Sequence, residues 1–412
     1  MFILSSHQEE LLKCGSLDVE RYDCRARHFG AGFTLIEMMI AIVLGMLLVA
    51  AASQLFIAGV VGSRLQSAGA DIQNNGLFGL DFLARDVRLA NAGNTNYLQI
   101  TDSTPMGGIV LTADPATAFG ATPSTASVSN LPYVLTAYNN TSSTVPSALL
   151  TSGAGDTVGT GNQWTGLSNV TSGGAALNSD QLTISYIAPS AMINCMGNTV
   201  NAGDYVVERY FLRYDAVGPS STSGIKNLVL ACDAGSIISG FGYLTGASAQ
   251  INGAEGGSSA TNSAVLCGTF TTPAVYSTTN PASLTTAANP SAGCATAFGS
   301  AGQVLMTRVD HLHILLGTIA QDGTNKMAYY TINQYKSLTS TPKPQIVSVA
   351  ISVLVRSQDN TGNVAINTNQ QYTMFDQTVT PASATGGASA NRYVRQVYET
   401  TIALRNAMGT SS

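Results

Sequence analysis

The feature that most constrains this chain is a long apolar segment with a single carboxylate at its start. No charged residue occurs between Met38 and Ser63, a run of 26 residues, and Glu37 lies immediately before it. At about 1.5 Å per residue this run forms a helix of roughly 39 Å, longer than the roughly 30 Å hydrocarbon core of a bilayer. Because a charge in hydrocarbon costs a few kcal/mol or more, a carboxylate at this place indicates a functional site.

Three interpretations of this segment compete. A plain transmembrane anchor explains the length of the run but not Glu37. A secretory signal peptide offers Ala50-Ala51-Ala52 as a cleavage site, but it leaves Glu37 at the start of the apolar core and an oddly long segment before it. The third starts from Gly32-Phe33-Thr34-Leu35-Ile36-Glu37, which follows a short basic cluster at 25–28. This motif resembles the prepilin signal of type IV pilins and pseudopilins, and it accounts for all of these features, so we prefer it.

The resemblance implies how the N-terminus is processed. Prepilin peptidase would cleave between Gly32 and Phe33 and methylate the new amino group of Phe33, and residues 1–32 would be a cleaved leader. Glu37 would serve the N-terminus of the neighbouring subunit in a filament and help recognition at cleavage. The leader is longer than the family's usual short basic leader and contains five acidic residues, so either the start codon is misassigned upstream or the long leader is genuine.

The helix is expected to continue beyond the membrane segment, which we place at about 38–60. Apolar residues return at helical intervals after Arg64, and Asn91-Ala92-Gly93-Asn94 provides a C-terminal stop. We therefore expect one helix from Phe33 to Ala90, within an N-terminal helical region of residues 33–92. Glycine costs about 1 kcal/mol relative to alanine inside a helix, so the glycines at 69, 76 and 79 predict a bend or a looser middle.

From residue 93 to 412 the pattern becomes that of a β-rich domain. Apolar and polar residues alternate at 182–186, 205–214, 347–355 and 394–404, which predicts half-buried strands of an antiparallel sheet. Turns are expected at Asp322-Gly323 and at 360–363. The Ser/Thr/Gly-rich stretches 101–179 and 246–302 are expected to be irregular strands or insertions. The predicted fold class is therefore α+β and pilin-like: a long N-terminal helix followed by a large antiparallel β-sheet domain.

The cysteines indicate an oxidising compartment for the β-rich domain. Cys14 and Cys24 lie in the expected leader, whereas four more follow it, and an even set on an extracytoplasmic domain predicts disulfides. Three pairings are open, with the sequential one preferred. No C-x-x-C spacing occurs, so neither a zinc site nor a thioredoxin-like site is predicted. The candidate disulfide residues are Cys195, Cys232, Cys267 and Cys294.

Composition and motifs give no support for an enzyme or a nucleic-acid-binding protein. Charged residues make up 10% of the chain and the net charge is −5, so no basic face for nucleic acid is expected. His311 and His313 lie on the same side of an expected strand and could share a metal, but no third ligand is placed near them, and we expect an exposed strand face instead. No G-x-S-x-G or G-x-G-x-x-G motif occurs, and no catalytic residue, metal or cofactor is predicted.

Local patterns in the β-rich region extend the resemblance to one branch of the superfamily. Together they look like the PilW-type minor pilins of type IV pilus systems; the related GspJ-type pseudopilins of type II secretion share the ending but are usually much shorter. The patterns are Asn91-Ala92-Gly93, the strand that begins at Ser179, Arg308 to Leu312, Val353 to Ser357, and Thr401 to Asn406.

The resemblance implies a function in pilus assembly. A PilW-type minor pilin spans the bacterial inner membrane once, with its C-terminal domain in the periplasm, and acts with other minor pilins, the major pilin and the inner-membrane assembly platform. Its complex primes assembly and would sit at the pilus tip, where it would serve fimbrial adhesion and twitching motility. Two alternatives stay open: a GspJ-like pseudopilin of type II secretion, and a membrane-anchored adhesin or surface-binding module.

Overall fold

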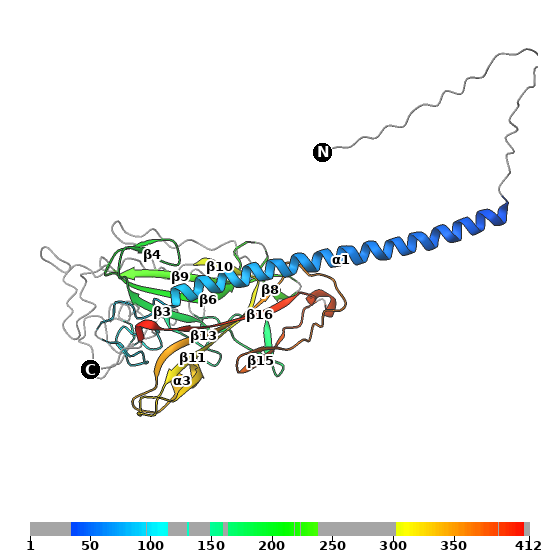
Figure 1. Cartoon of the computed structure of the whole chain (residues 1–412). Coiled ribbons are helices and arrows are strands. Elements are labelled where there is room, and N and C mark those ends of the chain that lie inside the picture. The colour runs from blue at the N-terminus through cyan, green and yellow to red at the C-terminus, as the bar shows by residue number, and fades with distance from the viewer. Residues whose placement is uncertain are drawn as a thin grey trace, which may run out of the picture. The chain divides into compact units, whose positions relative to one another are not determined.

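The computed structural model of the chain describes residues 34–95, 97–113, 130–131, 149–159, 164–217, 219–222, 224–237, 302–385 and 387–407. The chain divides into two compact units, residues 1–58 and 59–412. Figure 1 labels the main elements of both units. Helix α1 (Leu35–Val87) begins in the first unit and ends in the second.

The first unit contains the apolar part of α1. All its residues from Thr34 to Ala58 are exposed, although most of them are large and hydrophobic. The most apolar 18-residue window of the helix has a mean hydropathy of 2.6, and none of that window is buried. By length and composition this helix is able to cross a membrane.

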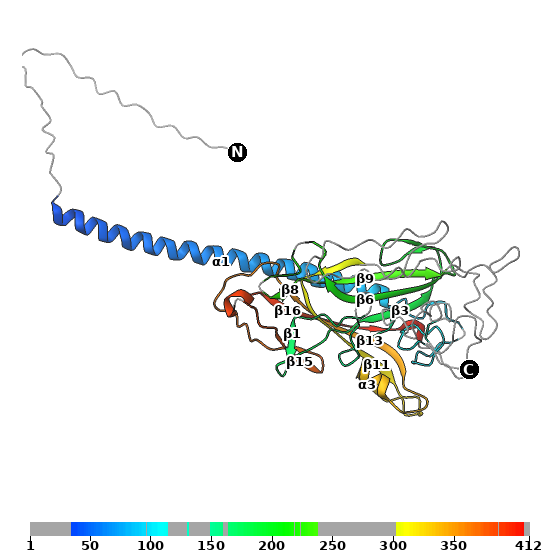
Figure 2. The same cartoon turned by 180° about the vertical axis from the view of Figure 1, so that it is seen from behind.

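The second unit is built on two four-stranded antiparallel sheets, which Figure 2 shows from behind. The first sheet has the order β10-β9-β6-β3 and the second the order β12-β11-β13-β16. The strands of the first sheet are β3 (Leu182–Ile187), β6 (Tyr205–Tyr214), β9 (Leu228–Ile237) and β10 (Gln303–Thr307). Those of the second are β11 (Val309–Ile319), β12 (Met327–Thr331), β13 (Gln345–Arg356) and β16 (Arg395–Ala403).

Smaller elements complete the second unit. A third antiparallel sheet has the order β14-β15-β1-β2, and β4-β5 and β7-β8 are two-stranded hairpins. A short helix, α3 (Ile332–Ser337), follows β12 and is closed by a capping box between Thr331 and Gln334. The remaining strands are β1 (Val170–Ser172), β2 (Ala175–Ala176), β4 (Met192–Ile193), β5 (Thr199–Val200), β7 (Ser221–Thr222), β8 (Ile225–Lys226), β14 (Tyr372–Met374) and β15 (Gln377–Pro381); Ala388–Asn391 and Arg405–Ala407 are 3₁₀ turns.

One hydrophobic core joins both large sheets to the C-terminal part of α1. Ile72, Leu83 and Val87 of the helix belong to the same buried cluster as Tyr210 of β6 and Ile351 of β13. The helix ends at Val87, three residues before the expected end, and Asn91 and Gly93 in the following turns have positive φ values of 64° and 72°. Such backbone favours glycine and asparagine, so this tetrapeptide turns the chain after the tighter turns at 86–90 that follow the helix. A long helix followed by antiparallel sheets confirms the predicted α+β pilin-like fold.

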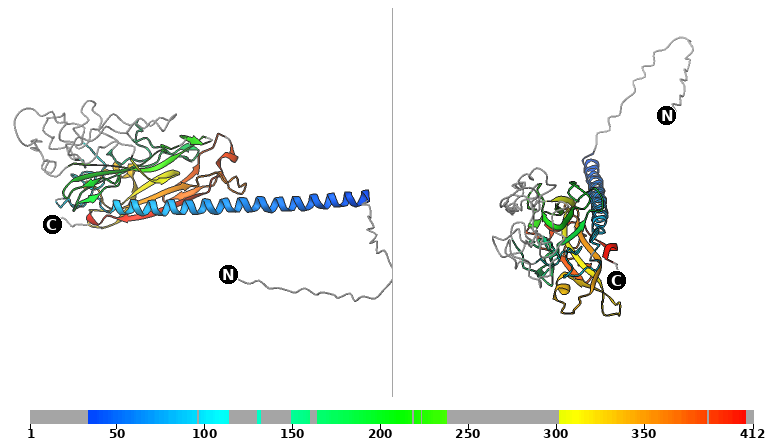
Figure 3. Two further views of the ribbon diagram at one scale, coloured as in Figure 1. Left: turned by 90° about the horizontal axis from the view of Figure 1, so that it is seen from above. Right: turned by 90° about the vertical axis from the view of Figure 1, so that its left-hand side faces the viewer.

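The helix glycines let the sheets approach α1 closely. A Cβ at Gly79 would lie 2.6 Å from Met306 Sδ, and one at Gly76 would lie 2.6 Å from Cδ2 of the Tyr398 ring. Figure 3 shows this part of α1 running beside the strands of the sheets. Helix α1 is continuous through these two glycines, and they are the points where β10 and β16 pack against it.

The central strands are buried on both faces, not half-buried as the alternation predicted. All residues of β6 and all but the first of β13 are buried. Leu354, on the second face of β13, packs with Met374 and Val379 of the small third sheet, which covers that face. Alternation indicated the strands correctly but did not show that a further sheet lies over them.

Much of the two Ser/Thr/Gly-rich stretches lies outside the described residues. Within the first stretch, the side chain of Asn130 accepts hydrogen bonds from the Leu111 and Thr112 amides and donates to the Thr101 and Thr104 carbonyls. Segments 107–110 and 151–152 continue the first sheet beyond β3 through isolated bridges at Ile109 and Ser152. These two segments are therefore ordered extensions of the first sheet, whereas β1 and β2 of the same stretch belong to the third sheet. The stretch 246–301 lies outside the described residues.

Candidate assembly site

The first described turn of α1 holds Glu37 with its carboxylate exposed. Thr34 precedes the helix, and its hydroxyl oxygen accepts a hydrogen bond from the Glu37 amide at 3.2 Å. This is the N-cap half of a capping box, which satisfies one of the free amides at a helix N-terminus. The carboxylate of Glu37 also lies where the helix dipole favours a negative charge. Gly32 and Phe33, the expected cleavage and methylation residues, lie outside the described residues.

Beyond the apolar part, α1 keeps an exposed aromatic surface. Phe78 is 76% exposed, Phe82 is 42% exposed and Leu77 is 63% exposed, whereas Leu80 and Leu83 of the same turns are buried. On the packed side, the Asn75 side chain donates to the carbonyl of Thr307 and accepts from its amide at 3.1 Å. Asn75 thereby pairs with the backbone at the end of edge strand β10, so α1 is held to this sheet by directional contacts as well as by packing.

A second group of polar residues lies where α1 meets the first sheet. Glu208 of β6 is buried, and its Oε1 accepts from the Tyr186 hydroxyl and from the Cys195 amide, both at 3.0 Å. The Tyr210 hydroxyl lies 2.9 Å from Glu208 Oε2 and 3.1 Å from Asp86 Oδ2 of α1. We call Asp86, Tyr186, Glu208 and Tyr210 the carboxyl–tyrosine cluster.

The pKa values of the two carboxyls in this cluster are raised. Burial, and then the charge of Asp86, raise the pKa of Glu208 to about 7, although its hydrogen bonds from Cys195, Tyr210 and Tyr186 act in the opposite direction. Burial raises the pKa of Asp86 to about 6, against the lowering effects of Tyr210 and Arg85. Burial raises the pKa of both tyrosines above the usual range, so their hydroxyls stay protonated.

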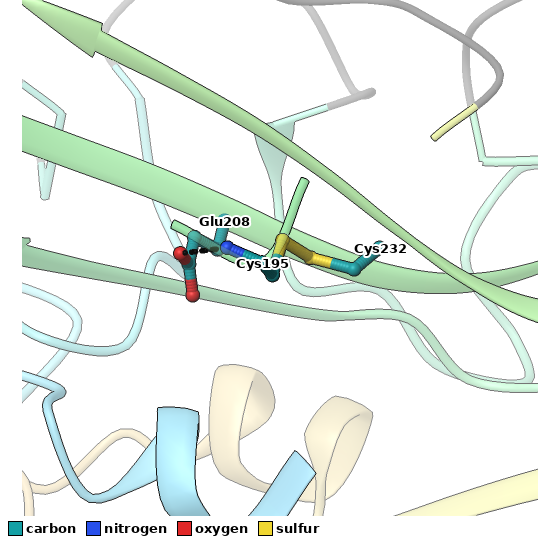
Figure 4. A group of neighbouring side chains, drawn as sticks. All are labelled: Cys195, Glu208 and Cys232. Atoms are coloured by element: carbon teal, nitrogen blue, oxygen red, sulfur yellow. Dashed lines mark hydrogen bonds between the residues drawn. A yellow bond between two sulfur atoms is a disulfide. The ribbon is translucent and has the colours of Figure 1, made fainter. Parts of the chain in front are cut away.

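A disulfide adjoins the carboxyl–tyrosine cluster. Cys195, just after β4, is bonded to Cys232 of β9, as Figure 4 shows beside Glu208. The Sγ atoms and a Glu208 oxygen lie within 4.8 Å of one another. Both sulfurs are used in the disulfide, so they offer no thiolate to a metal ion. Cys267 and Cys294, the other expected pair, lie outside the described residues.

The two histidines lie in the core, so the expectation of an exposed strand face is wrong. His311 is 1% exposed; its Nδ1 lies 3.2 Å from Ser168 Oγ and 3.1 Å from Ser179 Oγ, and its Nε2 accepts from Gln377. Burial, reinforced by the charge of His313, lowers the pKa of His311 to about 3. His311 is therefore a neutral structural residue with all its ring nitrogens occupied.

His313 is held between two carboxylates. Its Nδ1 donates to Asp180 Oδ2 at 2.9 Å and its Nε2 to Asp376 Oδ1 at 2.8 Å. Burial alone would lower its pKa, but the hydrogen bonds and charges of Asp180 and then Asp376 outweigh burial and raise the pKa above the usual value. A carboxylate only accepts hydrogen bonds, so the protonated form of His313 donates from both ring nitrogens and joins β11 to the turn between β14 and β15.

An ion triad lies at the end of the second sheet, and the sequence did not predict it. Asp310 of β11 accepts from Arg356 Nε at 2.9 Å and from Arg395 Nε at 2.7 Å, and all three side chains are buried. Both guanidinium groups lie over the ring of Tyr393. The only signal for the triad in the sequence was that Asp310 and Arg356 belong to two of the quoted family motifs.

Comparisons with known proteins agree with this architecture. A family model described as Type IV Pilus-assembly protein W matches residues 274–406, which include β10 to β16. A model of the prokaryotic N-terminal methylation motif matches residues 30–53, which include Gly32, Phe33 and Glu37. Comparison with curated proteins finds no match.

Comparison with solved structures finds a type IV-like pilin from Thermus thermophilus. The alignment has 12% sequence identity and a TM-score of 0.22, and it covers 55% of this chain and 79% of that chain. At this TM-score the likeness carries no argument, and the fold rests on the elements described above. The PilW and pilin-like families are structural and non-enzymatic, in agreement with the sequence prediction. The chain therefore has a match to a methylation motif at the start of an apolar helix and a match to the PilW family model over the strands from β10 to β16.

Proposed function

We propose that this protein is a minor pilin that acts in priming the assembly of a type IV pilus. The observation that carries the proposal is the coincidence of three features on one helix. The methylation-motif match covers residues 30–53, the helix over this range is apolar and fully exposed, and Glu37 is its one charged residue before Arg64. An exposed helix of this composition needs a lipid or protein environment to cover it.

Processing by prepilin peptidase would create a positively charged N-terminus that the Glu37 carboxylate can pair with. Cleavage between Gly32 and Phe33 leaves an α-amino group, methylated at Phe33, at the start of the helix. In the low-dielectric core of a filament that positive charge is costly unless it is paired. The first turn is closed by the Thr34 hydroxyl, which binds the Glu37 amide and leaves the Glu37 carboxylate exposed. That carboxylate is thus available to the N-terminus of a neighbouring subunit.

The size of the second unit favours a priming or tip position. The residues from Gly93 onward carry three four-stranded sheets, which would be bulky in the shaft of a tightly packed filament. The protein would span the inner membrane once through about 38–60, with residues 93–412 in the periplasm before assembly. Its partners would be other minor pilins, the major pilin, prepilin peptidase and the inner-membrane assembly platform.

Deletion of the gene, followed by complementation, tests this proposal. Deletion is expected to abolish or sharply reduce surface pili, counted by electron microscopy, while the major pilin is still made and processed. The wild-type gene and the control Asp71→Asn, an exposed carboxylate on the same helix, should restore pili, whereas Glu37→Gln should not.

Three outcomes would contradict the proposal. Normal piliation in the deletion strain excludes a role in priming. Loss of exoprotein release with intact pili would assign the chain to a type II secretion system instead. Normal pili combined with loss of surface binding would assign it to an adhesin.

A further inference from the structure

If both carboxyls of the carboxyl–tyrosine cluster are ionised, one of the two hydrogen-bond contacts of the Tyr210 hydroxyl has no proton. The Tyr210 hydroxyl carries a single proton, and it lies at hydrogen-bond distance from two carboxyl oxygens, Glu208 Oε2 at 2.9 Å and Asp86 Oδ2 at 3.1 Å. An ionised carboxylate only accepts hydrogen bonds. With both ionised, Tyr210 satisfies one of them and presents a lone pair to the other.

The other neighbours of Glu208 do not supply the missing proton. The Tyr186 hydroxyl and the Cys195 amide both donate to Oε1, the oxygen that does not face Tyr210. Among the described residues, the salt bridges that the structure contains do not include Glu208 or Asp86, and the one cation that acts on Asp86 is Arg85 of the same helix. One of the two carboxyl contacts of Tyr210 therefore needs a second proton. Glu208 is buried at 1% exposure whereas Asp86 is partly exposed, so the neutral form is favoured at Glu208.

We propose that Glu208 keeps a proton at mildly acidic pH, up to about neutrality, and that its hydrogen bond holds the end of helix α1 to the first sheet. Glu208 Oε2–H donates to the Tyr210 oxygen, and Tyr210 in turn donates to the Asp86 carboxylate. Each of the three contacting groups then has a donor matched to an acceptor. This chain of hydrogen bonds runs from β6 to the last turn of α1, where Asp86 precedes the buried Val87.

Loss of the proton from Glu208 turns its favourable interaction with Tyr210 and Asp86 into an unfavourable one. Ionised Glu208 would be a buried negative charge that shares Tyr210 with a second negative charge on α1, which is unfavourable in a low-dielectric site. The groups that face Glu208 are Asp86 with Arg85 from α1, Tyr186 from β3, Tyr210 from β6, and the Cys195 amide beside the disulfide to β9. The cluster is thus a pH-sensitive fastening between the helix that anchors the protein and the sheet that it carries.

The direction of the pH effect follows from the raised pKa of Glu208. A carboxyl whose pKa is about 7 in the folded chain and 4.5 unfolded binds more protons when folded, so its stabilisation is complete below pH 4.5 and is lost as the pH rises through about 7. Between these values the ratio of unfolded to folded protein should rise by up to about tenfold per pH unit through this group.

Infrared spectroscopy of the full chain in detergent tests the proposal directly. A protonated carboxyl has a carbonyl band that an ionised one lacks. We expect such a band in the wild type at pH 6 and its disappearance by about pH 8. Glu208→Gln, which keeps the shape and neutrality of the protonated side chain, should remove the part of the band that titrates through about pH 7 and leave only the part from Asp86, whose pKa is about 6. Asp86→Asn removes the second carboxylate, so the band of Glu208 should disappear at a lower pH. The control Asp71→Asn, exposed on the same helix, should change neither.

Chemical unfolding over the same pH range supplies the second readout. The Glu208→Gln variant should show a smaller loss of stability between pH 5 and pH 7 than the wild type. If Glu208→Gln does not reduce the protonated-carboxyl band of the folded protein at pH 6, the proposal is overturned. An unchanged pH slope in a folded Glu208→Gln variant also overturns it. If that variant does not fold, the pH at which the wild-type band disappears, and its shift to lower pH in Asp86→Asn, still test the proposal.

Discussion

Replacement of single glycines in α1 by alanine should have opposite effects at positions that look alike in the sequence. Alanine in place of glycine inside a helix stabilises it by about 0.8–1.0 kcal/mol when nothing obstructs the methyl group. At Gly69 no atom lies within 4 Å of the new Cβ, so Gly69→Ala should be stabilising by roughly that amount. This variant is the matched control for the packed glycines.

At Gly79 the new Cβ would overlap the Met306 side chain, with Sδ only 2.6 Å away. Met306 is fully buried between the helix and the sheet, so it has little room to move. Overpacking of a filled core costs about 1–3 kcal/mol, which exceeds the helix gain. Gly79→Ala is therefore expected to be about 1–3 kcal/mol less stable than Gly69→Ala. Gly76→Ala, which meets the Tyr398 ring, should behave in the same way as Gly79→Ala.

Denaturant unfolding of the full chain in detergent measures these differences. Trp164 is the single tryptophan, it is buried, and its Nε1 donates to the Ser179 carbonyl at 2.9 Å, so its fluorescence reports on the folded second unit. Equal stabilities of the Gly69→Ala and Gly79→Ala variants would refute the conclusion that β10 packs on α1 through this glycine.

Three further predictions concern the buried polar groups. Asp310→Asn leaves Arg356 and Arg395 without their shared carboxylate, so it should destabilise the chain by about 3–5 kcal/mol. The control Asp81→Asn, at an exposed position, should change stability by less than about 0.5 kcal/mol. Equal effects of the two variants in denaturant unfolding would contradict the buried triad. Loss of the disulfide through Cys195→Ser opens a link with a sequence separation of 37 and should cost about 4 kcal/mol on the loop-entropy relation; an unlinked Cys195 peptide in non-reducing mass spectrometry would refute the pairing. Because the pKa of His313 is raised, its stabilisation is present below pH 6.5 and is lost as the pH rises through the folded value. Asp376→Asn should shift that loss to lower pH, and an unchanged pH profile would contradict the contact.

The sequence was sufficient to predict the helix and the main strands, but not which parts of the chain pack around them. Tyr205–Tyr214 was predicted as a strand from its alternation, and β6 has those bounds, because period-two patterning reflects the geometry of the strand itself. Burial of both faces depends on what packs over the strand, which no local pattern encodes. His311 and His313 were misplaced for this reason, since their partners Ser168, Asp180 and Asp376 are far from them in the chain.

The cluster at the end of α1 shows the same limit. Asp86 lies in the predicted helix and Glu208 in the alternating stretch 205–214, and neither was singled out from the sequence. Their contact through Tyr210 joins residues 124 positions apart. By contrast, Glu37 was recognised from the sequence alone, because a carboxylate at the start of a 26-residue uncharged run is unusual whatever surrounds it.

The central claim is that the apolar helix is a processed prepilin segment, and the mature N-terminus tests it most directly. The protein should be purified from cells that contain prepilin peptidase, and its N-terminal peptide identified by mass spectrometry. We predict that the peptide begins with N-methylated Phe33, and that Gly32→Val leaves residues 1–32 attached. A wild-type chain that keeps its first 32 residues in the presence of the peptidase, or one that begins after the Ala50-Ala51-Ala52 segment, would contradict the account.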